Sequence, residues 1–310
     1  MIDVRPLGTK LGAEIGGVDL ARLNDADFAQ VYDAFLEHAV LVFHDQQLDM
    51  PQFLAHARRF GPLRPHIVRK SRHREFPELM MLDSKIEDTR VGVQEKPKAN
   101  LVKRGAVWHT DTSYDYVTAK ATQLYARTIP SRGGDTLFAS AYAAYDALPA
   151  ALKRRIDGLK ATYKYGGRLK REVQLLEEED RVRPPSVHAL VRVHPETGRK
   201  AIYFNPGQVM EVVGLSTADG DALVEELKGY VESADGDYRH KWRVDDLVMW
   251  DNRCVLHAAT GDYPPHERRT LWRATMMEPG WEAADAIARA AVGFTPTVPS
   301  ASPAAMSHGD

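Results

Sequence analysis

The sequence predicts a mainly β protein with flanking helices. Many short segments rich in β-branched and aromatic residues fill the middle and the end of the 310-residue chain. Turn sequences such as PSRGGD and PETGRK separate several of these segments. Helical patterns between them are few, whereas a parallel α/β sheet needs a helix between successive strands. These observations favour a closed or double-sheet β architecture.

Two helices and a buried strand are expected in the first sixty residues. Asn24 is a candidate cap for a helix whose apolar residues, among them Phe28 and Phe35, share one face. The apolar run 39–43 that follows has the character of a buried strand. A second helix is expected over residues 49–60, with a proline tolerated in its first turn.

The remaining elements follow from local patterns. Strands are expected at ELMML (78–82), ATQLYARTI (121–129), ATYKY (161–165), HALVRVH (188–194), KAIYFN (200–205), YRHKWRV (238–244), DLVMWD (246–251) and RTLWRATMM (269–277). A helix is expected at 216–233, where Ser216 and Asp219 form a candidate capping box. The polar segment 87–104 is expected to be a loop, either a mobile cover over a site or a solvated connection.

Domain organisation follows from composition along the chain. With 44% hydrophobic residues the chain can bury a core, and we expect residues 1–280 to form a single domain. Residues 281–310 are rich in alanine, proline and serine, so a poorly ordered C-terminal tail is expected there.

Charge and cysteine usage exclude several classes of protein. Lys and Arg number 41 against 43 Asp and Glu, so no overall field favours nucleic acid or an anionic membrane. Cys254 is the single cysteine, and it cannot form an intramolecular disulfide. No basic start followed by an apolar stretch and no run of 18 apolar residues is present. We therefore expect a cytoplasmic protein with no nucleic-acid partner and no membrane span.

The stretch VWHTDTSYDY (107–116) carries a candidate metal site. If AVWHTD is extended, His109 and Asp111 project from the same face because side chains alternate along a strand. His257, which follows a strongly apolar strand far downstream, offers a third ligand. Two histidines and one carboxylate leave three positions for a bidentate co-substrate and dioxygen on Fe(II), whereas zinc prefers a closed tetrahedron or one open position. An HxD tripeptide alone also occurs by chance in many proteins.

A competing set of ligands is less favourable. His194 and Glu196 lie in the turn sequence HPETGRK, where Pro195 disrupts the alternation of side chains.

Two arginines near the C-terminus are candidates for binding anions. Arg269 and Arg273 are four residues apart in ERRTLWRATM and share a face if this segment is a strand. A guanidinium binds a carboxylate through two parallel hydrogen bonds, so up to two anions are indicated. The alternative is a pair of solvated arginines on an outer face.

Several longer motifs together resemble a known family. WHTD, GGDTLFASAYAAYDALP, HPETGRKAIYFN, WDNRCVLH and RRTLWRATM occur in this order and resemble the taurine dioxygenase and 2,4-dichlorophenoxyacetate dioxygenase family. These are Fe(II)- and 2-oxoglutarate-dependent enzymes. The likeness extends from LGAEIGGVDL to about Met277 and implies a double-stranded β-helix (jelly-roll) core.

The resemblance implies roles for residues at the metal and co-substrate. It makes His109, Asp111 and His257 the Fe(II) ligands. It makes Thr136 of GGDT and Arg269 the partners of the distal carboxylate of 2-oxoglutarate.

For the substrate, the resemblance implies two further residues. Arg273 resembles the arginine near the co-substrate and the acidic group of the substrate. His66 of FGPLRPH resembles a histidine that faces the substrate. The alternative for His66 is a solvated loop histidine in the basic run RPHIVRKSRHR.

The function implied is the hydroxylation of a small anionic organic acid with 2-oxoglutarate and O2, with release of succinate and CO2. The substrate is expected to be a sulfonate such as taurine or an aryloxyalkanoate such as 2,4-dichlorophenoxyacetate, and the hydroxylated product then fragments. DLVMWDNRCVLH resembles the herbicide-degrading branch, whereas FGPLRPH resembles the sulfonate branch. The family likeness also implies a homo-oligomer, a dimer or higher.

Two other classes of function remain open at this point. One is a non-catalytic β-barrel protein that binds a small molecule, for which the loss of a metal ligand or of the co-substrate arginine would be typical; none is missing. The other is nucleic-acid binding through RPHIVRKSRHR, which is poorly supported because the rest of the chain is not basic.

Overall fold

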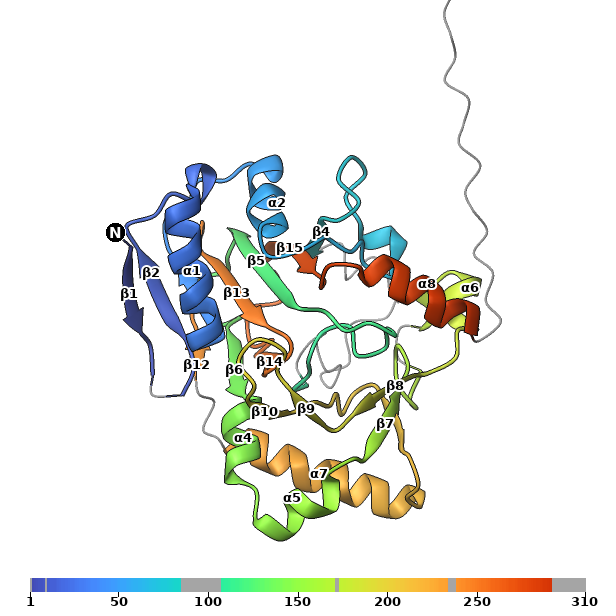
Figure 1. Ribbon diagram of the computed structural model, residues 1–310. Coiled ribbons are helices and arrows are strands. Elements are labelled where there is room, and N and C mark those ends of the chain that lie inside the picture. The colour runs from blue at the N-terminus through green and yellow to red at the C-terminus, as the bar shows by residue number, and fades with distance from the viewer. Residues whose placement is uncertain (1, 9, 85–106, 171–172, 234–237, 292–310) are drawn as a thin grey trace, which may run out of the picture.

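A seven-stranded sheet forms the main layer of the molecule (Figure 1). The computed structural model describes residues 2–8, 10–84, 107–170, 173–233 and 238–291. Across this sheet the order is β1 (Asp3–Pro6), β2 (Ala13–Gly16), β3 (Val40–Phe43), β13 (Leu247–Asp251), β5 (Ala121–Thr128), β15 (Thr270–Met276) and β4 (Met80–Asp83). Neighbouring strands are antiparallel except β2 and β3, which are parallel.

Three smaller sheets complete the β structure of the described residues. They are β12 (Tyr238–His240), β6 (Thr136–Ser140) and β14 (Val255–Ala259); β11 (Val209–Val212), β7 (Lys160–Tyr163) and β8 (Ser186–Ala189); and the pair β10 (Lys200–Ile202) and β9 (Val191–Val193). Phe138 of β6, Leu256 of β14 and Trp250 of β13 belong to one buried cluster. The largest core therefore joins the main sheet to the sheet that contains β6 and β14.

The N-terminal helices cover the main sheet. Helices α1 (Asp25–His38) and α2 (Met50–Arg58) contribute Phe35 and Phe53 to a second buried cluster, which includes Met249 and Trp272 of the sheet. Asn24 caps α1 by accepting a hydrogen bond from the N–H of Asp27, as predicted. The α2 helix ends two residues before the predicted boundary.

Further helices lie between the strands along the chain. They are η1 (Leu20–Arg22), η2 (Arg69–Ser71), α4 (Ala141–Ala147), α5 (Ala150–Ile156), η3 (Val173–Leu175), α6 (Glu178–Arg181) and α7 (Thr217–Ser233). Ser216 caps α7, because its Oγ accepts the N–H of Asp219 at 3.2 Å. No helix among the described residues is long and apolar enough to cross a bilayer.

The mainly β architecture with flanking helices is confirmed. Each of the eight segments predicted as strands overlaps an observed strand, although Leu190 separates β8 from β9 within 188–194. The predicted loop 87–104 lies outside the described residues.

The C-terminal region differs from the expectation in its first part. Residues 281–310 were expected to be a poorly ordered tail, but helix α8 occupies Trp281–Ala291. Arg183 donates to Asp285 of this helix at 3.1 Å, and the guanidinium of Arg64 lies 5.8 Å from the centre of the Trp281 ring. These tertiary contacts, which composition does not reveal, hold the helix. Residues 292–310 lie outside the described part of the chain.

Candidate metal centre

Two histidines far apart in sequence are joined directly by their backbones. The N–H of His109 donates to the carbonyl of His257 at 3.0 Å, and the reverse hydrogen bond measures 2.9 Å. His257 belongs to β14, which pairs with β6. His109 lies outside the named strands, so this antiparallel bridge attaches its segment to the sheet.

The Asp111 side chain completes a cluster of three donor groups. Its Oδ1 lies 3.9 Å from Nε2 of His109 and 3.8 Å from Nε2 of His257. One ligand atom from each residue falls within a 4.8 Å span, so one metal ion can contact all three. The structure therefore brings together the three residues that the sequence predicted. The predicted extended strand is not formed over the described residues 107–111, where a single bridge at His109 replaces it.

The protonation states of these groups suit a divalent cation. Nδ1 of His109 donates to the carbonyl of Val107 at 2.7 Å, which leaves the lone pair on Nε2, the nitrogen nearer Asp111. Desolvation lowers the pKa of His109 and, more strongly, that of His257, so both rings are neutral. Metal binding to neutral imidazoles needs no proton release.

The carboxylate ligand is ionised despite its burial. Burial by itself raises the pKa of Asp111, but the guanidinium of Arg273, together with the hydrogen bond from Thr122, outweighs this effect and holds the pKa below its usual range. Nη2 of Arg273 forms an ion pair with Oδ1 at 2.8 Å, and the Thr122 hydroxyl donates to Oδ2 at 2.7 Å. Two neutral nitrogens and one ionised oxygen form a donor set that fits Fe(II).

The GGD turn lies next to both predicted co-substrate residues. Nε of Arg269, the residue before β15, donates to the carbonyl of Gly134 at 3.0 Å. Gly134 has φ +74°, and a Cβ added there would lie 3.1 Å from Cδ and Nε of Arg269. Thr136 begins β6 two residues later, and its Oγ1 accepts a hydrogen bond from Trp242 at 3.0 Å. The turn thus places the Arg269 side chain beside the strand that carries Thr136.

The predicted substrate residues differ in position. Arg273 lies on β15 in direct contact with Asp111, as described above. His66 is half-buried in the loop between α2 and η2, where its Nδ1 accepts the N–H of Val68 at 3.1 Å. The same loop is tied to the segment after Asp111, because Arg64 donates to Asp115 at 2.7 Å.

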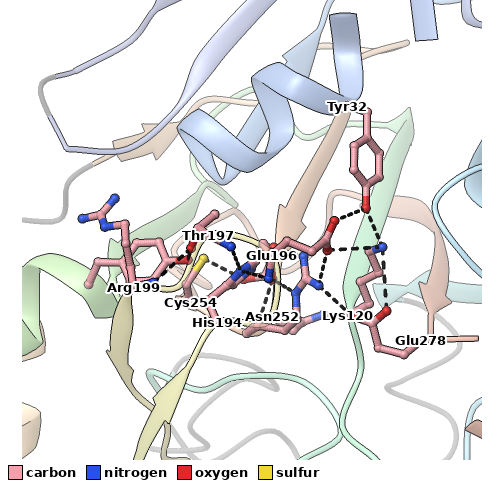
Figure 2. A network of polar contacts seen from close by, with 12 residues as sticks. Tyr32, Lys120, His194, Glu196, Thr197, Arg199, Asn252, Cys254 and Glu278 are labelled. Atoms are coloured by element: carbon pink, nitrogen blue, oxygen red, sulfur yellow. Dashed lines mark hydrogen bonds and ion pairs between the residues drawn. The ribbon is translucent and has the colours of Figure 1, made fainter. Parts of the chain in front are cut away.

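His194, in the turn considered as a competing metal site, belongs to a network of polar contacts in which both of its ring nitrogens have partners (Figure 2). Nδ1 of His194 accepts the N–H groups of Glu196 and Thr197, and its Nε2 lies 3.0 Å from Asp251. The guanidinium of Arg253 binds both carboxylate oxygens of Asp251, at 2.8 and 2.6 Å.

Cys254 is the third possible ligand of that second cluster. Burial raises the pKa of its thiol well above the ordinary value. Both ring nitrogens of His194 already have hydrogen-bond partners and the thiol of Cys254 stays protonated, so this cluster does not suit a metal ion.

One residue at the site escaped sequence reasoning. Thr122 lies on β5 and binds the carboxylate of Asp111 through its hydroxyl. Threonine is common in strands, so nothing in the local pattern distinguishes it.

Comparisons with known proteins find relatives that match most of the chain. The model of the taurine catabolism dioxygenase TauD, TfdA family matches residues 3–275. The (S)-phenoxypropionate/alpha-ketoglutarate-dioxygenase of Sphingobium herbicidovorans is 34% identical over 291 residues, covering 91% of this chain and 97% of that protein. The alpha-ketoglutarate-dependent 2,4-dichlorophenoxyacetate dioxygenase of Cupriavidus pinatubonensis is 35% identical over 280 residues, covering 88% and 96%.

A solved structure is similar over nearly its whole length. The crystal structure of AAD-2 in complex with Mn(II) and N-oxalylglycine has a TM-score of 0.73 and 29% identity, with 90% of this chain and 98% of that chain covered.

Proposed function

Since this chain belongs to the taurine catabolism dioxygenase TauD, TfdA family, we propose that His109, Asp111 and His257 bind the Fe(II) ion of a 2-oxoglutarate-dependent dioxygenase. The core of the enzyme is a double-stranded β-helix, or jelly roll. It uses Fe(II), 2-oxoglutarate (alpha-ketoglutarate) and O2. Non-catalytic binding, the alternative considered for the sequence, finds no support, because both relatives described above are named as dioxygenases.

One observation carries the proposal for the metal. The Nε2 atoms of His109 and His257 both lie within 3.9 Å of the same oxygen of Asp111, and all three groups are in the state that binds a cation. Bound Fe(II) would supply the oxidation of a C–H bond to C–OH, coupled to the conversion of 2-oxoglutarate and O2 to succinate and CO2.

The protein supplies the groups that bind and orient 2-oxoglutarate. We propose that Arg269 forms an ion pair with its distal carboxylate, because the Gly134 carbonyl orients the guanidinium through Nε. The Thr136 hydroxyl accepts a hydrogen bond from Trp242, so its own hydrogen is available to donate to the same carboxylate. Such fixed contacts hold the co-substrate in one orientation.

For the substrate we propose a small organic acid, either a sulfonate or an aryloxyalkanoate. The two relatives described above are named for phenoxypropionate and 2,4-dichlorophenoxyacetate, and the family is named for taurine. Arg273 brings a guanidinium to the metal ligands, and this cation suits an acidic group there. Hydroxylation of the carbon that bears the sulfonate or the aryl ether oxygen yields an unstable product that fragments. A substrate contact for His66, a homo-oligomeric assembly and a cytoplasmic location remain predictions.

Succinate formation tests this proposal. Protein purified without oxygen is supplied with Fe(II), 2-oxoglutarate and O2, together with taurine, longer alkylsulfonates, sulfate esters, phenoxyacetates, phenoxypropionates or phosphonates in turn. We expect one acid to raise succinate well above the rate without substrate, and the amide of that acid, which lacks the charge, to raise it far less. Absence of any succinate from protein with iron bound would refute the proposed activity.

A further inference from the structure

Asn252 lies in the turn that connects the two sheets at the candidate metal centre. The turn follows β13 of the main sheet and precedes β14, which carries His257. Asn252 is 1% exposed. Its backbone N–H donates to the carbonyl of Lys120 at 2.9 Å, and its carbonyl accepts the Thr110 hydroxyl at 2.7 Å. The turn is thereby attached to the segments that precede Asp111 and Thr122.

The side chain of Asn252 forms hydrogen bonds with the backbone of Asp111, with Trp250 and with Thr122. Oδ1 accepts the backbone N–H of Asp111 at 3.3 Å and the indole N–H of Trp250 at 3.0 Å. Nδ2 donates to Oγ1 of Thr122 at 2.9 Å. The Thr122 hydroxyl in turn donates to Oδ2 of Asp111 at 2.7 Å.

This chain of hydrogen bonds has a single direction. Because the Asn252 amide donates to Thr122, the threonine hydroxyl must direct its hydrogen to Asp111. Oδ2 of Asp111 is thereby held, and Oδ1 faces the two histidines and the guanidinium of Arg273. Asn252 thus acts on the backbone and, through Thr122, on the side chain of the same ligand.

The network in Figure 2 holds the turn itself in place. Arg253 binds Asp251 through two hydrogen bonds and donates to Glu196 and Glu278, both at 2.6 Å. Asp251 and Arg253, the neighbours of Asn252, are 1% and 5% exposed. Buried charges that satisfy one another in this way rigidify the segment that carries them.

We infer that Asn252 is a positioning residue that fixes the orientation of the Asp111 carboxylate and thereby sets the metal affinity of the centre. The inference rests on the proposed role of Asp111 as a metal ligand. Partners of a ligating carboxylate that do not touch the metal commonly contribute about tenfold to a hundredfold to metal affinity.

Co(II) binding to the metal-free protein, followed by its visible absorption, tests the inference without any turnover. In Asn252→Asp the carboxylate cannot donate to Thr122, and Thr122→Val removes the hydroxyl at nearly constant shape. We expect both variants to bind Co(II) about tenfold to a hundredfold more weakly and to change the shape of its spectrum. Thr122→Ser keeps the hydroxyl and is expected to restore both affinity and spectrum.

A second buried amide provides the matched control. Asn205 is 2% exposed and donates to the carbonyl of Thr110 at 3.1 Å, while its Oδ1 accepts the N–H of Gly207. Asn205→Asp makes the same chemical change and is expected to keep an affinity close to that of the wild type. Thermal unfolding of each metal-free variant separates lost stability from lost positioning.

The outcomes distinguish this inference from the proposed function. Wild-type affinity in Asn252→Asp or Thr122→Val, or equal weakening in Thr122→Ser or Asn205→Asp, would overturn the positioning role. If Asn252→Asp does not fold, the Co(II) affinities of Thr122→Val and Thr122→Ser are compared to decide whether the hydrogen bonds to Asp111 set the metal affinity. Asp111→Ala is measured alongside: if the wild type binds no Co(II), or Asp111→Ala binds it normally, the metal site itself is wrong and the inference fails with it.

Discussion

His109 and His257 exchange backbone hydrogen bonds in both directions, at 3.0 and 2.9 Å, and their ring centres lie 4.1 Å apart. The relative placement of the two imidazoles is therefore set by the backbone and not by the side chains alone. Because His257 lies within β14, the sheet fixes the position of this residue. The backbone bridge then fixes His109 relative to His257.

The Arg269 side chain is expected to determine the affinity for 2-oxoglutarate. Loss of a hydrogen bond to a charged group costs about 2 kcal/mol, so Arg269→Ala should raise the KM for 2-oxoglutarate by about thirtyfold or more. Succinate formation against 2-oxoglutarate concentration measures this. Arg268→Ala is the control, since the neighbouring Arg268 binds Asp83 instead. Unchanged saturation in Arg269→Ala would contradict the assignment.

Gly134 is expected to matter to the co-substrate through its contact with Arg269. Gly134→Ala and Gly158→Ala both place a Cβ at positive φ, +74° and +76°, which costs about 1 kcal/mol of stability in each case. A Cβ at position 134 would also lie 3.1 Å from the Arg269 side chain, whereas nothing lies within 4 Å at position 158. Only Gly134→Ala should raise the KM for 2-oxoglutarate. An equal effect of the two variants would show that backbone strain alone is responsible.

Arg253 is expected to contribute strongly to stability. Its removal leaves the buried carboxylate of Asp251 without this cationic partner, and the carboxylates of Glu196 and Glu278 lose the same partner. Breaking a buried ion pair in this way costs about 3–5 kcal/mol, so Arg253→Met should lower the free energy of unfolding in urea by that amount.

An exposed ion pair serves as the comparison for Arg253. Arg168 pairs with Asp221 at the surface, with side-chain exposures of 42% and 49%. Arg168→Met should change the free energy of unfolding by less than about 1 kcal/mol. Similar losses in the two variants would mean that the Arg253 network contributes no more than a surface pair.

Acid should destabilise the protein partly through His56. Burial lowers the pKa of this fully buried histidine from 6.5 to about 4, although a hydrogen bond to Gln123 opposes the shift. The unfolded chain therefore takes up a proton at a higher pH than the folded protein does. The stability that His56 contributes by remaining neutral is fully present above about pH 6.5 and is lost as the pH falls towards about 4.

Urea unfolding at two pH values measures the contribution of His56. The free energy of unfolding should fall by about 2 kcal/mol more between pH 7 and pH 5 in the wild type than in His56→Gln. His266→Gln, at a side chain that is 83% exposed, should keep the pH dependence of the wild type. The same pH dependence in His56→Gln and the wild type would show that this histidine is not the source.

Local sequence patterns predicted the elements better than they predicted the contacts between them. The β-branched and aromatic residues around Trp250 and Trp272 predicted β13 and β15, because such residues are enriched in strands. The pairing of β13 with both β3 and β5 depends on contacts between distant segments, which no local pattern encodes.

At the candidate site too, the sequence predicted the residues but not the contacts that hold them. The residue types at His109, Asp111 and His257 indicated metal chemistry, but the expected strand around His109 is only a single bridge. Hydrogen bonds from Thr122 and Asn252 hold Asp111 where strand geometry was expected to do so. The Thr122 contact arises from tertiary packing and leaves no spacing that can be recognised in the sequence.

Anaerobic titration with Fe(II) is the most direct test of the central claim. We expect the wild type to bind one ion per chain and each of His109→Ala, Asp111→Ala and His257→Ala to lose that binding while remaining folded. His266→Ala, at an exposed histidine, should bind as the wild type does. Wild-type affinity in any one of the three ligand variants would contradict the account.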